Sequence, residues 1–168
     1  MVATTVFLVL STMVVVSFRS TQVENDLRDA KALIISHVEA LRSDARSGMV
    51  RGALAPRAYA IGFEPGAESI HETLDADGCG VGVETYATTQ LPKGVRVSPE
   101  LAGSFGVAFY VPDGQMVIEP SCPQDQVCVP PCDSNEVAAS DVTFTLSLVH
   151  ESGKQTDITF DMIRGVVE

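Results

Sequence analysis

The first 18 residues of the chain contain no charged side chain, and Arg19 is the first charged residue. As an α-helix this run would be about 27 Å long, at about 1.5 Å per residue. That length approaches the roughly 30 Å hydrocarbon core of a bilayer. We therefore expect a helix that spans a membrane or is buried among copies of itself. The apolar residues that support this expectation are Val2, Val6, Phe7, Leu8, Val9, Leu10, Met13, Val14, Val15 and Phe18.

Two other interpretations of this run fit its flanks less well. A cleaved signal peptide begins with Lys or Arg and ends in a small-x-small cleavage site. Here no basic residue comes first, and the run ends in Ser17-Phe18-Arg19-Ser20. A core helix of a soluble protein is disfavoured because 18 successive uncharged residues leave it no polar face.

The helical pattern continues past Arg19, since neither Gly nor Pro occurs before Gly48. Apolar residues recur every three or four positions, as they do along one face of a helix. They are Val23, Leu27, Ala30, Ile34, Val38, Leu41 and Ala45. The opposite face carries charged residues, and we expect His37 at the surface among them. Gly48 is a usual C-terminal stop, so we predict a first domain, residues 1–48, made of one helix of roughly 70 Å.

Residues 49–168 have the pattern of a second domain rich in short strands. Alternating apolar residues and turn signals predict six to eight antiparallel strands. The candidate segments are 57–64, 68–74, 80–88, 91–97, 104–111, 115–119, 141–149, 154–161 and 163–168. Residues 119–140, which contain four prolines and three cysteines, resemble neither helix nor strand and are predicted to form an inserted loop. The fold class we expect is α+β, with a long N-terminal helix packed on an antiparallel β-sheet.

The charge balance argues against two classes of function. The chain has 11 Lys and Arg against 22 Asp and Glu, a formal charge of −11. A nucleic-acid-binding protein needs a basic surface to displace counterions from phosphate, so we predict no nucleic-acid partner. A basic face that docks on anionic lipid headgroups is disfavoured for the same reason.

The four cysteines are Cys79, Cys122, Cys128 and Cys132. A zinc site is disfavoured because no two of them form a C-x2-C pair. Export, which the N-terminal helix implies, favours two disulfides instead. Three pairings remain open, and in each of them Cys79 bonds to a cysteine of the 122–132 cluster if both bridges are intramolecular.

Asp75 and Asp77, followed by Gly78, are the candidate metal ligands of the sequence. A calcium loop needs further oxygen ligands at fixed spacing, and Cys79 and Gly80 interrupt that pattern. We therefore expect an acidic turn and no metal site. None of the three histidines lies in a nucleophile–base motif, so we predict no enzymatic activity and no cofactor.

The uncharged run MVATTVFLVLSTMVVVSF, which leads into an amphipathic stretch ending at Gly48, resembles the N-terminal helix of the type IV pilin superfamily. In that family a Phe-Thr-Leu-x-Glu-Leu-type stretch directly precedes such a run. Position 5 here is Thr5 and not glutamate. Two explanations stay open: the native start lies upstream of Met1, which we favour, or the subunit lacks the family's assembly glutamate.

The second domain resembles the GspH/FimT-like branch of that superfamily, which comprises minor pilins and the H-type pseudopilin of type II secretion. The resemblance rests on residues 57–63, 91–95, 107–114, 156–160 and 163–166. It implies a structural subunit that is exported, held in the inner membrane, and assembled through its N-terminal helix into a surface filament. The subunit would polymerise with its own copies or with other pilin subunits. The alternatives are an H-type pseudopilin of a type II secretion system and a single-pass anchored ectodomain for adhesion or ligand binding.

Overall fold

The computed structural model describes the backbone of residues 2–50, 56–75, 83–101, 103–120, 143–161 and 165–167. Side chains are described for residues 18–50, 56–75, 84–101, 103–117 and 143–161. Within this part of the chain the protein is α+β, with one long helix and nine strands in two antiparallel sheets.

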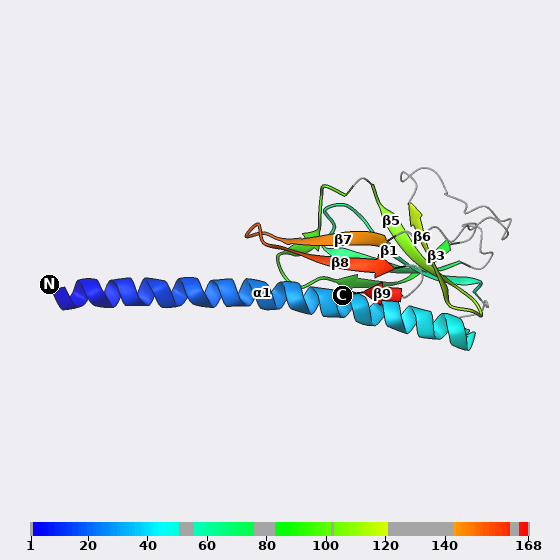
Figure 1. Ribbon diagram of the computed structural model, residues 1–168, viewed down its shortest axis with the longest axis horizontal. Coiled ribbons are helices and arrows are strands. Elements are labelled where there is room, and N and C mark those ends of the chain that lie inside the picture. The colour runs from blue at the N-terminus through cyan, green and yellow to red at the C-terminus, as the bar shows by residue number, and fades with distance from the viewer. Residues whose placement is uncertain are drawn as a thin grey trace.

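Helix α1 runs from Val2 to Ser47 without a break. Its C-terminal half lies along the sheets, and its N-terminal half extends well beyond them (Figure 1). The helix ends as the sequence predicts, at Gly48, whose φ of 61° is a left-handed conformation that glycine adopts without strain. The Gly48 amide donates to the carbonyl of Ala45 (3.3 Å), and the Met49 amide donates to that of Asp44 (3.1 Å). These two bonds satisfy carbonyls that the last turn of a helix otherwise leaves unpaired.

The larger sheet has five strands in the order β3-β2-β1-β5-β6. Their bounds are Ala58–Phe63 (β1), Ser69–Asp75 (β2), Val83–Gln90 (β3), Phe105–Tyr110 (β5) and Gln115–Pro120 (β6). Strands β5 and β6 form a hairpin through the predicted Pro112-Asp113-Gly114 turn. This turn lies against the end of α1, because a Cβ added to Gly114 would be 2.6 Å from Arg46 Cγ.

The smaller sheet has four strands in the order β4-β7-β8-β9. Their bounds are Val95–Val97 (β4), Thr143–His150 (β7), Gln155–Asp161 (β8) and Gly165–Val167 (β9). The β7–β8 hairpin pairs over its whole length, from Thr143 with Asp161 to Val149 with Gln155. Strand β9 pairs with β8 only at Thr159, Phe160 and Asp161.

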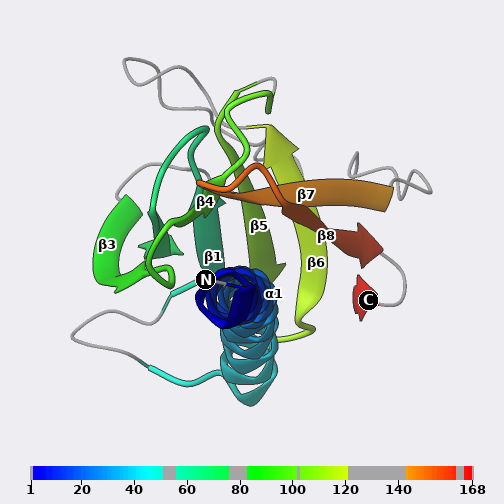
Figure 2. The ribbon, with the colours of Figure 1, turned by 90° about the vertical axis from the view of Figure 1, so that its left-hand side faces the viewer.

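The core lies between α1 and the two sheets. Seen end-on, the helix has strands of both sheets around its upper side (Figure 2). The apolar stripe that the sequence predicted faces this core: from Leu27 to Ala45 its members are at most 5% exposed, and Val23 is partly buried. Four phenylalanines meet between the sheets, with Phe105 from β5 and Phe144 from β7 only 4.1 Å apart by ring centroids. Packing of a predicted helix face on two sheets therefore builds one continuous core.

The structure corrects two details of the sequence prediction. The described strands form two sheets and not one, and there are nine of them, not six to eight. The predicted loop 119–140 begins too early, because Glu119 and Pro120 pair with Gly106 and Phe105 as the end of β6. Proline is tolerated there since β6 is an edge strand of its sheet. The remainder of that predicted loop, from residue 121 on, lies outside the described residues.

Candidate functional site

The candidate site is helix α1 where it leaves the β-domain. The helix projects past the sheets toward its N-terminus (Figure 1). Phe18, the first residue with a described side chain, is 74% exposed. The side chains of residues 1–17 lie outside the described part, so the role predicted for Val2, Val6, Phe7, Leu8, Val9, Leu10, Met13, Val14 and Val15 stays a prediction. From Phe18 onward, the described residues include no helical stretch that is long and apolar enough to cross a membrane.

Polar contacts fix the helix where it enters the domain, and we call their members the polar collar: Ser20, Glu24, Asp26, His150 and Lys154. Lys154, which follows the β7–β8 turn, donates through Nζ to Glu24 Oε1 at 2.7 Å and to Ser20 Oγ at 2.9 Å. His150 Nε2 lies 3.9 Å from Asp26 Oδ2. The hydrogen bond and the charge of Lys154 lower the pKa of Glu24 below its ordinary value. The collar thus ties one hairpin to the helix at the point where apolar packing begins.

Further toward the C-terminus of α1, the helix is held by a second polar contact, which we did not predict from the sequence. His37 Nδ1 contacts Glu72 Oε1 of β2, and their side chains are 26% and 8% exposed. His37 is therefore partly exposed, as expected of a surface residue, but it also has a partner in the core that was not expected. Glu72 is buried because it follows the fully buried Ile70 by two positions in β2, and alternate residues of a strand lie on the same face. That alternation was the available signal for a buried carboxylate needing a partner.

The other predicted site residues are not brought together. Asp75 ends β2, and its carbonyl accepts a hydrogen bond from the Arg57 amide at 2.8 Å. Asp77 lies outside the described residues, as do Cys79, Cys122, Cys128 and Cys132 with their predicted disulfides. Within the described part, no group of three His, Cys, Asp or Glu side chains is placed to hold a metal ion.

Of the remaining histidines, His71 contacts the neighbouring strand, and His150 contacts both its own turn and helix α1. His71 Nδ1 lies 3.1 Å from Thr88 Oγ1 across the β2–β3 pair. His150 belongs to the polar collar, and its Nδ1 accepts from the Ser152 amide at 3.0 Å within the β7–β8 turn. Among the described side chains, the arrangement therefore presents a means of holding a projecting helix and not a cluster of reactive groups.

No protein-family model, curated protein or solved structure matches this chain. Its function is accordingly argued from the helix, its packing and its charge.

Proposed function

We propose that this protein is a pilin-like structural subunit that assembles into a filament through its N-terminal helix. The observation that carries the proposal is the division of α1. Among the side chains described, those from Phe18 on, its apolar stripe is buried from Leu27 onward, whereas the uninterrupted helix begins at Val2. About 27 Å of helix, the uncharged residues 1–18, precedes the polar collar.

An uncharged helix of this length needs lipid or other protein around it. In the proposed pathway the exported subunit is first held in the inner membrane by residues 1–18. Assembly then replaces lipid contacts by contacts with the same segment of neighbouring subunits, from this chain or from other pilins. Head-to-tail contacts that do not close into a ring generate a helical fibre.

The composition of residues 1–18, which we call the leading segment, supports such packing. Small and hydroxyl residues allow close approach of neighbouring helices, and their hydroxyls bond within their own helix. They are Ala3, Thr4, Thr5, Ser11, Thr12 and Ser17. The role is structural, with the acidic β-domain facing outward on the cell surface or, if the filament is short, within a type II secretion apparatus.

The test places a charge in the leading segment. Val9→Asp and Val14→Asp are each expected to abolish filaments, because a carboxylate is costly to bury in helix packing or at a bilayer centre, about 2.5–3.5 kcal/mol by insertion scales. Filaments are scored by sedimentation and electron microscopy of cells that supply all partner subunits. Two matched controls should assemble normally: Val14→Leu, which stays apolar, and Ser43→Asp, which puts the same charge on the exposed face of α1.

The anchored ectodomain makes the opposite prediction. Under it, the unaltered full-length chain stays a monomer in membranes when every partner subunit is present. Sedimentation of the unaltered chain as a monomer under those conditions would reject the filament role.

A further inference from the structure

A groove of about 730 Å³ lies between α1 and the beginning of β8, next to the polar collar. Leu27 and Ile35 of the helix give it an apolar floor, and Lys154 to Thr156 form its other wall. Ala32 lines it and is exposed. Its volume falls within the range of protein sites that bind ligands, about 300–1,000 Å³.

The groove runs along a part of β8 that lacks a neighbouring strand on that side. Strand β7 covers one edge of β8 throughout, but β9 covers the other edge only from Thr159. In the described part of the chain, no strand pairs with the outer edge of residues 155–158. Four residues of extended chain give an edge about 13 Å long.

The backbone groups of this edge point toward the helix. The His150 amide donates to the Lys154 carbonyl, so the even-numbered residues of β8 face β7. Gln155 and Asp157 therefore direct their N–H and C=O groups outward. Lys31 Nζ donates to the Asp157 carbonyl at 3.1 Å, an exposed contact from a side chain that can swing away. An edge of this kind accepts another strand readily.

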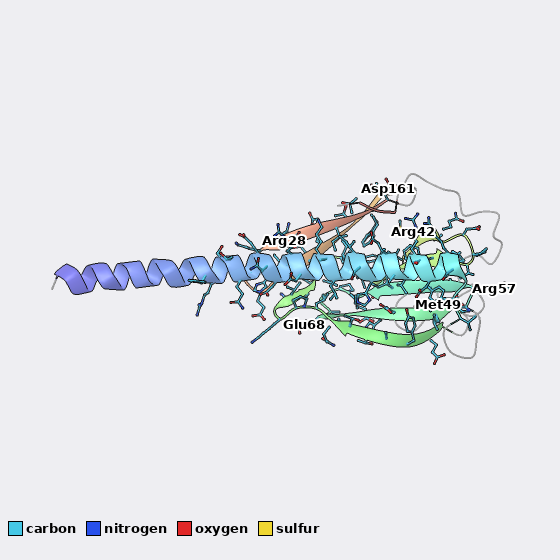
Figure 3. The ribbon with its side chains drawn as sticks, turned by 90° about the horizontal axis from the view of Figure 1, so that it is seen from below. Arg28, Arg42, Met49, Arg57, Glu68 and Asp161 are labelled. Atoms are coloured by element: carbon cyan, nitrogen blue, oxygen red, sulfur yellow. The ribbon has the colours of Figure 1, made fainter. Side chains whose placement is uncertain are left out.

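The charges around the groove differ from those of the chain as a whole. Arg28, Lys31 and Lys154 line it together with a single carboxylate, Glu24, although the chain carries −11 overall. Figure 3 shows Arg28 on the side of the helix toward the orange strands of the smaller sheet. A cationic groove on an acidic protein favours an acidic occupant and steers it to this place.

We propose that this groove binds an extended, acidic segment of a partner protein, which adds as a strand to the outer edge of β8. Its backbone pairs with Gln155 and Asp157. Because side chains alternate along a strand, its apolar residues lie on Leu27 and Ile35 while its carboxylates meet Arg28 and Lys154. This is peptide recognition by strand addition, and it does not depend on the filament role.

The experiment uses the full-length chain in detergent and a fluorescent eight-residue peptide of alternating Glu and Val, with binding followed by anisotropy. We expect saturable binding that weakens as salt is added. Two further peptides test the charge contacts and the backbone pairing separately. The Gln/Val peptide removes the charges and is expected to bind at least about tenfold more weakly. The Glu/Val peptide with N-methyl groups on every residue has no backbone N–H to donate and is expected not to bind.

Variants of the protein, each with a matched control, test whether the peptide binds in the groove. Ala32→Trp fills the groove and should abolish binding, whereas Ala40→Trp, also exposed on α1 but outside the groove, should leave it unchanged. Arg28→Glu should weaken binding about tenfold, and Arg96→Glu, exposed on β4 at the opposite edge of the sheet, should not.

Three results would overturn the proposal. They are absence of binding by the Glu/Val peptide, equal binding of its N-methylated form, and unchanged binding to the Ala32→Trp protein. Circular dichroism of that variant verifies that it is folded. Filament formation is not a readout, so failure here leaves the proposed structural role standing.

Discussion

Of the residues that the structure describes, Glu72 is the buried one with a carboxylate, and its side chain is only 8% exposed. Its contact with His37 links β2 to the middle of α1. A buried polar group that loses its partner costs more than the bond itself contributes, because it has also lost water. The pair therefore helps to fix where the helix lies on the larger sheet.

His37→Ala is expected to lower the free energy of unfolding by about 1–3 kcal/mol, because it leaves Glu72 unpaired. Chemical denaturation measures this loss. His71→Ala, which removes an exposed contact with Thr88, should change stability by no more than about 0.5 kcal/mol. In a double-mutant cycle with Glu72→Gln, the two losses should be non-additive by about 0.5–3 kcal/mol. Additive losses would show that the two side chains act independently.

Glu24 gives the domain a dependence on pH. Lys154, by hydrogen bond and charge, lowers the pKa of Glu24 below its ordinary value of 4.5. The unfolded chain therefore takes up this proton at a higher pH than the folded one. The stabilisation is complete above about pH 4.5 and is lost as the pH falls through the lower folded value. The effect is small, since the Glu24 and Lys154 side chains are 67% and 41% exposed.

Glu24→Gln is accordingly expected to lower Tm slightly at neutral pH, with the difference from the unaltered chain closing in acid well below pH 4.5. Thermal unfolding followed at several pH values provides the measurement. Glu39→Gln, an exposed position on the same helix, serves as the control. A Tm difference that persists in acid would mean that the Glu24–Lys154 contact is not its source.

Among the secondary-structure elements, the β5–β6 hairpin and the end of α1 pack so closely that their contact excludes a side chain. A Cβ on residue 114 would lie 2.6 Å from Arg46 Cγ and 3.3 Å from the Arg42 carbonyl oxygen. Gly114 also has a φ of 64°, which disfavours other residues. The position of this turn is thus set by the helix as well as by the hairpin.

Gly114→Ala is expected to destabilise the protein by about 2–5 kcal/mol, from a left-handed residue (about 1–2 kcal/mol) and overpacking (about 1–3 kcal/mol). Gly66→Ala isolates the first part, because Gly66 has a φ of 76° and open space around its Cβ position. It should cost about 1–2 kcal/mol. Equal losses for the two variants in denaturant unfolding would remove the helix contact as a cause.

The elements also show which parts of the fold local sequence could predict. The stripe from Leu27 to Ala45 and the stop at Gly48 were predictable because helix periodicity and caps are local. The division into two sheets was not, because it depends on which distant strands pair: β1 with β5, and β4 with β7. The His37–Glu72 contact joins residues 35 positions apart and was missed for the same reason.

For the whole molecule, the presence of a long helix and a strand-rich domain was predictable from the sequence, but the way they pack together was not. The uncharged first 18 residues and the later alternating segments predicted a projecting helix on a β-domain. The view from below shows α1 lying between the green strands of one sheet and the orange strands of the other (Figure 3). The position of the helix could not be predicted without knowing how both sheets lie. The groove beside β8 likewise lies where no described strand pairs with the outer edge of residues 155–158.

Helix α1 runs without a break from Val2 to Ser47, so its residue count sets how the β-domain is rotated relative to the start of the helix. An α-helix rotates by about 100° and advances about 1.5 Å with each residue. One residue inserted between Phe18 and Ser20 would rotate the β-domain by about 100° about the helix axis and move it by only about 1.5 Å along that axis. The orientation of the β-domain about the helix axis therefore depends on the number of residues between the start of α1 and the polar collar.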